Sequence, residues 1–463
     1  MTTTEADAFY AARDVRTVQY GGDAGALGEP VTLMVMSAAA QTRSGQVAAL
    51  ALVEMLTRVH RNVRIVTPEG PLLCQSGTGD AFHDALHATA AGIDPHQDTH
   101  RAPVTGELVV QVGHGPCLQV PAVLAAWNGG RGEVHLDGVA PASPPALSPE
   151  SDDTLNVLGA ATAAVLAAAA TFRLVHGDSP RSAALNLLER TADGDAGNAS
   201  VTGPVDVGDV LMIGAGAVAH GTAYWVREFG HAGRWRVADA DPAEIHNTGR
   251  CLGMTASDAG WPGGRPTATA WPKVDTAAAM IGAEPDPRWF DQTDYCNDDR
   301  PDLILPLANE RGVRAEVGQL GESLLLHATT SQNWTAELHR HVAGQDDCPG
   351  CRIREEDGPV LACSQGGARP QQPGSRDAAL PFLSAGAGLL LTVALLDLAA
   401  DATLLQERVN HWRLHLELGA RLWQQLQHRG DGCPHALSYD VAQSLHRQAP
   451  RRWDAVASGP RAR

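Results

Sequence analysis

The stretch VLMIGAGAVAH, residues 210–220, decides the fold. Its four leading apolar residues predict a buried strand, and the segment that follows the glycines opens a helix. Gly214 and Gly216 match the first two glycines of a dinucleotide-binding fingerprint, and Ala219 replaces the third. Small residues here let the backbone approach a phosphate at a helix N-terminus. The stretch predicts a parallel α/β sheet with an anion-binding turn, although some such turns only connect a strand to a helix.

Charged and amide side chains follow the next predicted strand, WRVADAD, residues 235–241. Asp239 ends that strand in the position of a ribose-binding acid, and Asp241, Asn247 and Arg250 come soon after it. Parallel α/β folds bind ligands just beyond their strand ends. Each residue alone is typical of a solvated loop. Together they favour a triphosphate site, because a nicotinamide dehydrogenase needs the acid but not the asparagine and arginine.

Lys273 is the single lysine among the 35 basic residues of the chain. Arginine is a rigid planar fork, whereas lysine is a compact, mobile point charge that can follow a phosphate through a reaction. A site that needs this property would resist replacement by arginine. The alternative is chance retention in an arginine-biased sequence.

In this order of motifs (GAG, DAD, NTGR and PKVDTA) the chain resembles the ThiF/MoeB and ubiquitin-activating enzymes. The resemblance spans roughly residues 207–434 and reaches the first half more weakly. It implies adenylation of the C-terminal carboxylate of a ubiquitin-like protein with MgATP. It also implies ribose contacts for Asp239 and Asp241, and triphosphate contacts for Asn247, Arg250 and Lys273.

Two features depart from the family pattern. About ten extra residues, including GWPGG, lie between Arg250 and Lys273. The segment LPLANE, residues 305–310, places Asn309 where the family has its magnesium-binding aspartate. An amide oxygen can bind Mg²⁺ but brings no charge. Either Glu310 takes over this role or the metal contact is weaker.

Four residues have the spacing of a structural zinc site. Cys348 and Cys351 form a CxxC pair, and Cys433 and His435 form a CxH pair. A Cys₃His set is an ordinary structural zinc ligand set. The alternative is a knuckle without metal.

Cys363 lies in a Gly-, Pro- and Gln-rich segment, LACSQGGARPQQPG. MoeB-like activators that form thioesters have a closely similar run, so the resemblance implies that Cys363 accepts the acyl group. Arg354 or Arg369 could lower its pKa and favour the reactive thiolate. The alternatives are an inert thiol or a spare zinc ligand. Cys296 is a weaker rival, because acidic neighbours would raise its pKa.

The two halves of the chain share an order of elements: β-α-β, a further strand, a loop and a long apolar helix. The polar, Gly-rich segment 189–209 predicts a linker, which divides residues 1–200 from residues 201–463. We therefore expect an α/β fold with two Rossmann-like parallel-sheet adenylation domains in tandem, a pseudo-dimer with a zinc knuckle in the second domain. The first half lacks the glycine pattern and resembles the inactive copy of a ubiquitin-activating enzyme. In the family an N-terminal arginine reaches the γ-phosphate, and Arg13 or Arg16 stands at that place.

Composition excludes some classes of partner. The net charge of −18 argues against nucleic acid. The apolar segments that begin at Thr154 and Leu380 predict buried helices rather than membrane spans, and the N-terminus has no apolar core of a signal peptide. We expect a cytoplasmic enzyme that uses ATP, Mg²⁺ and Zn²⁺ and passes a thioester to a conjugating enzyme. A homodimer is possible. The alternatives are a sulfur-carrier or peptide adenylyltransferase without the thioester step, and a nucleotide-binding scaffold with an inactive site.

Overall fold

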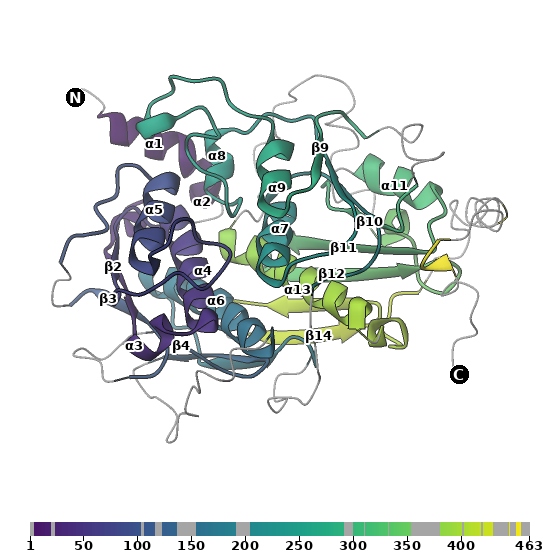
Figure 1. The fold of residues 1–463 in the computed structure, drawn as a ribbon, viewed down its shortest axis with the longest axis horizontal. Coiled ribbons are helices and arrows are strands. Elements are labelled where there is room, and N and C mark those ends of the chain that lie inside the picture. The colour runs from purple at the N-terminus through teal and green to yellow at the C-terminus, as the bar shows by residue number, and fades with distance from the viewer. Residues whose placement is uncertain are drawn as a thin grey trace.

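The computed structural model describes most of the chain, which folds into two β-sheets with helices packed between and around them (Figure 1). The described residues are 4–19, 24–102, 106–115, 123–136, 154–190, 204–290, 300–309, 311–331, 333–352, 380–400, 402–417, 420–428, 444 and 451–454.

The first sheet has six strands in the order β2-β1-β3-β4-β5-β6, of which β2, β1, β3 and β4 are parallel. Strands β5 and β6 are antiparallel to their neighbours. The strands are β1 (Val31–Val35), β2 (Val63–Val66), β3 (Leu108–Val112), β4 (Val123–Asn128), β5 (Arg131–Leu136) and β6 (Ala183–Asn186). The main helices of this half are α4 (Arg43–Val59), α5 (Phe82–Ile93) and α6 (Thr154–Val175).

The second sheet has eight strands in the order β14-β13-β12-β11-β10-β7-β8-β9. Strands β9, β8, β7, β10 and β11 are parallel, and β12, β13 and β14 continue the sheet antiparallel. The strands are β7 (Val210–Ile213), β8 (Trp235–Ala238), β9 (Glu284–Asp286), β10 (Leu303–Pro306), β11 (Leu324–Ser331), β12 (Thr335–Val342), β13 (His411–His415) and β14 (Arg421–Gln425). The main helices are α7 (Ala217–Phe229), α9 (Lys273–Ile281), α11 (Arg311–Gln319) and α13 (Pro381–Ala400).

The two halves follow one plan, as the sequence predicts. In the first, β1, α4 and β2 are followed by β3, β4, antiparallel β5, α6 and β6. In the second, β7, α7 and β8 are followed by β10, β11, antiparallel β12, α13 and β13. The mixed α/β architecture with two mostly parallel sheets is therefore as expected. The predicted boundary at residue 200 falls within residues 191–203, which lie outside the described residues.

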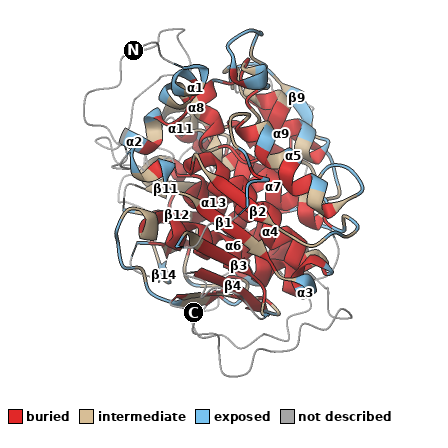
Figure 2. Ribbon diagram, turned by 90° about the vertical axis from the view of Figure 1, so that its left-hand side faces the viewer, coloured by how far each residue is buried: buried red, intermediate tan, exposed pale blue. Residues whose placement is uncertain are grey.

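Helices α6 and α13 form the centre of the molecule. They contact each other, while α6 packs on α4 and α13 packs on α7. One continuous hydrophobic cluster runs through both halves. The central helices and strands are accordingly buried (Figure 2). Both helices are long and apolar enough to cross a membrane, but 94 % of the most apolar window of each is buried inside the fold. They serve here as core helices.

Glycines allow the close approach of α7 and α13. A Cβ atom built on Gly388 would lie 2.3 Å from the backbone carbon of Gly221, and one built on Gly221 would lie 2.5 Å from the carbonyl oxygen of Ser384. No real Cβ tolerates such distances, so both positions require glycine.

Short elements complete the fold around this core. They are α1 (Glu5–Arg13), α2 (Val15–Gln19), α3 (Ser37–Ala40), α8 (Ile245–Thr248), α12 (Pro349–Arg352), η1 (Ala26–Gly28), η3 (Pro262–Gly264) and η5 (Thr403–Leu405). Helix α1, at the N-terminus, packs on α8 of the second half (Figure 1). The first residues of the chain are thereby brought to the strand ends of the second sheet.

Candidate functional site

The predicted phosphate turn lies where the second sheet changes direction. Strand β7 has β8 on one side, reached through α7, and β10 on the other. The loops that leave β7 and β10 therefore separate to opposite sides. In open parallel sheets this switch point forms the ligand-binding crevice at the carboxyl ends of the strands.

The turn itself depends on Gly214. Its φ of +93° is a conformation that disfavours side chains, and a Cβ at this position would lie 2.6 Å from the backbone nitrogen of Ala308. Gly216 caps α7 at its N-terminus, and Ala219 is fully buried in the first turns of that helix. The loop after β10 closes on the same turn, because the amides of Leu307 and Ala308 both donate to the carbonyl of Ile213 at 2.8 Å.

Asp239 links the end of β8 to the glycine turn. Its carboxylate accepts hydrogen bonds from the amide of Ala215 at 2.6 Å and from the amide of Asp241 at 2.8 Å. Burial raises the pKa of Asp239, against the opposing effects of Lys273 and these two amides. The carboxylate thus fixes the turn, besides lying where the resemblance implies a ribose contact.

Lys273 lies over the same strand end, at the start of α9. Its Nζ is 2.6 Å from Oδ2 of Asp241, and its backbone amide donates to the carbonyl of Asp241 at 3.0 Å. Burial opposes the charge of Lys273, but Asp239 and Asp241 outweigh it and raise the pKa of the amine. The single lysine of the chain therefore stays charged, with 14 % of its side chain exposed, beside the predicted phosphate turn.

Two arginines join this lysine around His246. Burial first, and then the positive charges of Arg250, Arg16 and Lys273, lower the pKa of His246 to about 4. His246 is consequently neutral at neutral pH. The charges of three cations, Arg16 from the first half and Arg250 and Lys273 from the second, thus act on His246, a residue that the sequence did not indicate.

Arg13 does not belong to this group. It is fully buried, and its guanidinium lies 2.6 Å from Asp14 and 2.6 Å from Asp94 of the first half. It also donates to the carbonyl of Thr57. The structure thus holds the charge of Arg13 in two buried ion pairs, although its backbone lies against Gly249, next to Arg250. Of the two N-terminal candidates, Arg16 is the one whose charge acts on His246.

The two asparagines occupy different environments. Asn247 is buried in α8, where its Oδ1 accepts from the amide of Glu244 at 2.8 Å as part of a capping box. Asn309 is exposed, next to the loop that closes on Gly214. Asn247 shapes the loop that leads to Arg250, and Asn309 lies at the end of β10 as predicted. Glu310 lies outside the described residues.

The extra residues between Arg250 and Lys273 pack on the N-terminal helix. Trp261 meets Phe9 of α1 with ring centroids 6.1 Å apart, and Ala256 and Ala259 join the same buried cluster. Arg265 pairs with Glu5 at 2.8 Å. The insertion thus fastens α1, which leads to Arg16, to the second half.

Only part of the predicted cysteine chemistry falls within the described residues. Cys348 is buried just before α12, and its Sγ accepts a hydrogen bond from the amide of Cys351 at 3.3 Å. This N–H···S contact is one that a metal-bound thiolate would accept. The other residues concerned lie outside the described residues: Cys296, Arg354, Cys363, Arg369, Cys433 and His435.

Two groups of side chains that could hold a metal ion were not foreseen. They are His83, His87 and His100 in the first half, and Glu337, His339 and His411 in the second sheet. The spacing His-x₃-His at residues 83–87 is the signal that could have indicated the first group. The second is brought together only by the pairing of β12 with β13.

Comparison with known proteins gives partial matches. Residues 30–187 match a family model described as the BilD N-terminal domain, which is less than half of the chain. A search of curated proteins finds no match. Among solved structures, E. coli MccB is 12 % identical with a TM-score of 0.35, and the match covers 50 % of this chain and 65 % of MccB. PaaA is 12 % identical with a TM-score of 0.31, and the match covers 47 % of this chain and 64 % of PaaA. The chain thus matches less than two thirds of the length of both proteins.

Proposed function

We propose that this protein adenylates the C-terminal carboxylate of a ubiquitin-like protein with ATP and then carries the acyl group as a thioester. The observation that carries the proposal is the position of Lys273, whose partner Asp241 donates its amide to Asp239, the carboxylate that holds the Gly214–Gly216 turn at the sheet switch point. The positive charges of Arg250 and Arg16 act with that of Lys273 on the neighbouring His246. A triphosphate needs cations and backbone amides at a helix N-terminus, and this place offers both.

In the first step, a carboxylate oxygen of the carrier attacks the α-phosphorus of ATP. A P–O bond forms, the bond to the β-phosphate bridging oxygen breaks, and pyrophosphate leaves with the electron pair. Lys273 and Arg250 offset the negative charge of this transition state. Binding of the triphosphate requires Lys273 to exchange its contact with Asp241 for phosphate oxygens, for which a mobile amine is suited.

The carboxylates beside the turn serve nucleotide binding in this proposal. Asp239 and Asp241 accept from the ribose hydroxyls, and the amides at the start of α7 face the phosphates. Asn309, at the end of β10, offers an oxygen donor to Mg²⁺, which prefers oxygen ligands. When bound, Mg²⁺ would neutralise part of the charge on the phosphates.

In the second step, the Cys363 thiolate attacks the acyl carbon of the adenylate. A C–S bond forms, the C–O bond to the phosphate breaks, and AMP leaves with the electron pair. The thioester then passes to the thiol of a conjugating-like enzyme. Cys296 is the next candidate if Cys363 is not the acceptor.

A zinc ion at Cys348, Cys351, Cys433 and His435 is proposed as a separate structural element. The N–H···S contact between Cys351 and Cys348 supports it. Elemental analysis of protein purified without added metal should detect zinc, of which Cys348→Ala loses one equivalent, together with solubility. Wild-type protein without zinc would contradict this assignment.

The first half is proposed to be the inactive copy, with the boundary between residues 1–200 and 201–463. Two observations support this division: the shared order of elements, and a family-model match that ends at residue 187. The first half supplies Arg16 to the site of the second, so that one chain does what two subunits of simpler activators do. A further association into a homodimer is compatible with this plan.

One observation favours a different function. The charged groups beside the turn already have partners within the protein: Lys273 pairs with Asp241, and Asp239 accepts hydrogen bonds from two backbone amides. An inactive nucleotide-binding scaffold would have the same contacts. ATP–pyrophosphate exchange with the cognate carrier decides between an adenylating enzyme and an inactive scaffold. Exchange that requires Lys273 supports an adenylating enzyme, and absence of exchange with a proven carrier supports the scaffold. If exchange occurs without a thiol-sensitive adduct, the protein is an adenylyltransferase without the thioester step.

A further inference from the structure

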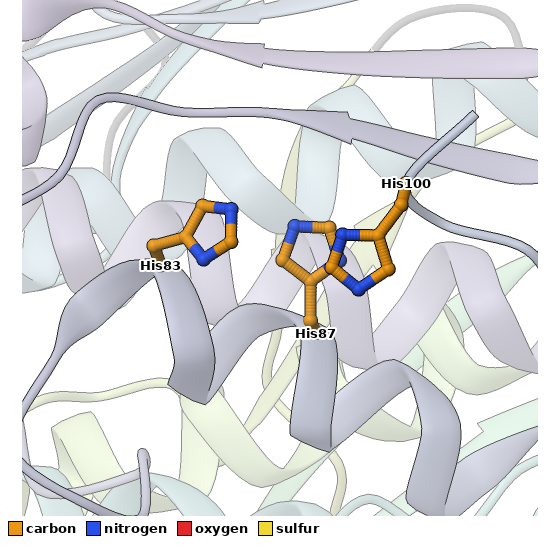
Figure 3. A group of neighbouring side chains, drawn as sticks. All are labelled: His83, His87 and His100. Atoms are coloured by element: carbon orange, nitrogen blue, oxygen red, sulfur yellow. The ribbon is translucent and has the colours of Figure 1, made fainter. Parts of the chain in front are cut away.

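Three histidines that the proposed reaction does not use meet on the first half of the chain. His83 and His87 are one helical turn apart on α5, and His100 comes from the segment that follows the helix (Figure 3). Each ring offers one nitrogen, and these three nitrogens lie within 4.8 Å of one another. The centroid of His83 lies 4.4 Å from that of His87, and the rings of His87 and His100 are stacked with centroids 3.9 Å apart. Because a metal ion binds in the plane of an imidazole ring, the exposed ring of His100 must turn out of this stack before it and His87 can bind one ion.

Two of the rings have their orientation fixed by neighbouring oxygens. Nδ1 of His87 lies 2.7 Å from the hydroxyl of Thr99, and Nδ1 of His83 lies 3.1 Å from the carboxylate of Asp84. A metal-bound imidazole is usually held in this way through its second nitrogen. The contacts leave Nε2 of both rings available to a metal ion.

Burial suits a cation that is open to solvent on one side. His87 is buried, His83 is partly exposed and His100 is exposed.

The second group of candidate ligands is less suitable. His411 already bonds to Glu337 at 2.8 Å, and the guanidinium of Arg413 lies 3.6 Å from the same carboxylate oxygen. Arg352 lies 2.7 Å from Nδ1 of His339. Two guanidinium groups at this distance repel a further cation.

We propose that His83, His87 and His100 bind a divalent transition metal ion, physiologically Zn²⁺, with water at the open position. Three imidazoles with one open position are a known zinc ligand set. The ion would join α5 to the segment 97–100. That segment covers the outer edge of the first sheet, because the amide of Ile65 in β2 donates to the carbonyl of Thr99 at 3.1 Å. The metal ion would therefore hold the segment 97–100 in place against the edge strand β2.

The experiment uses full-length protein, stripped of metal and titrated with ZnCl₂. The variants are His83→Gln and His100→Gln, whose side chains reach solvent and whose loss should leave the metal-free melting temperature unchanged. The control is His415→Gln, a partly exposed histidine outside both groups. We expect each site variant to lose one bound Zn²⁺, or to weaken its binding at least about tenfold, and to lose the zinc-induced rise in melting temperature. The control should behave as wild type.

Cobalt separates this site from the cysteine knuckle. Co²⁺ bound only by histidines gives visible d–d absorption without a thiolate charge-transfer band. His83→Gln should remove the first signal and keep any thiolate band. The proposal is overturned if both site variants bind Zn²⁺ in wild-type number and affinity, or if all bound Co²⁺ shows thiolate ligation.

Discussion

Nζ of Lys273 lies 2.6 Å from Oδ2 of Asp241, while the backbone amide of Lys273 donates to the carbonyl of the same aspartate. The double contact joins the start of α9 to the end of β8. It holds a charged amine ready beside the glycine turn, where a phosphate could displace the carboxylate.

Replacement of this amine should abolish adenylation without unfolding the protein. Lys273→Ala is expected to lower ATP–pyrophosphate exchange by roughly 100- to 1,000-fold, the usual effect of removing a group that stabilises developing charge. Lys273→Arg should fail nearly as badly, because the planar fork cannot follow the phosphate. Arg234→Ala, at an exposed ion pair with Glu284, is the control and should exchange normally. Wild-type exchange by Lys273→Ala would show that the active site lies elsewhere.

Replacement of Arg13 should lower the stability of the protein, whereas replacement of Arg16 should lower its activity. Arg13→Ala leaves the buried carboxylate of Asp94 without its partner and should lower the free energy of unfolding by about 3–5 kcal/mol. Arg16→Ala should change this free energy by less than about 0.5 kcal/mol. It should nevertheless lower pyrophosphate exchange about tenfold or more. Urea unfolding and exchange assays on both variants test the pair, and equal exchange by Arg16→Ala and wild type would remove Arg16 from the site.

Cys363 should be required for the thioester but not for adenylation. Mixing the enzyme, ATP and the carrier should give a covalent adduct that thiols cleave, seen on non-reducing gels. Cys363→Ala should lose this adduct and retain pyrophosphate exchange, because adenylation comes first and uses other residues. Since the only amines are Lys273 and the N-terminus, almost all of the adduct should be thiol-sensitive. A normal adduct in Cys363→Ala would move the thioester to another cysteine, with Cys296 the next to test.

Buried histidines should make the protein unstable in weak acid. Burial lowers the pKa of His220 to about 4, while the unfolded chain keeps the ordinary value of 6.5. Between these values the unfolded state binds more protons, so the free energy of unfolding falls as the pH decreases from about 6.5 to about 4, by up to about 1.4 kcal/mol per pH unit for this group. His220→Gln should show a shallower decrease in urea unfolding measured from pH 7.5 to pH 5. An unchanged slope would show that His220 is protonated in the folded state.

The contact between α7 and α13 should tolerate no added methyl group. Gly388→Ala places a Cβ against the backbone of Gly221 and should cost about 3 kcal/mol or more in the free energy of unfolding. Gly386→Ala, on the same helix, meets Ala336 and Val165 only at 3.4 Å and should cost less than about 1 kcal/mol. Thermal unfolding of the two variants checks the prediction, and equal stability would mean that the helices are not so closely packed.

The sequence predicts the parts of this fold that rest on strong local patterns. The apolar runs at residues 31–35, 63–66 and 210–213 are strands, and both long apolar helices are buried. The antiparallel strands β12 to β14 were not predicted, because their histidines, arginines and glutamines hide the alternation of a buried strand. Helix α7 begins at Ala217, directly after the glycine turn, as the sequence predicts.

The site was predicted only as far as neighbours in sequence determine it. The positions of Asp239, Asp241 and Lys273 follow from strand ends and spacing. The environment of Arg13 does not, because it depends on Asp94, which is 81 residues away in sequence. His100 comes from the segment after α5, so the His-x₃-His spacing on that helix does not indicate it.

The packing of Phe9 against Ala256, Ala259 and Trp261 also sets an order of events during synthesis. Helix α1 leaves the ribosome before these partners, which are made roughly 250 residues later, on the order of 10–50 s at ordinary translation rates. Until then Phe9 lacks its apolar surroundings. During synthesis the first half therefore leaves Phe9 of α1 unpacked until residues 256–261 of the second half have been made.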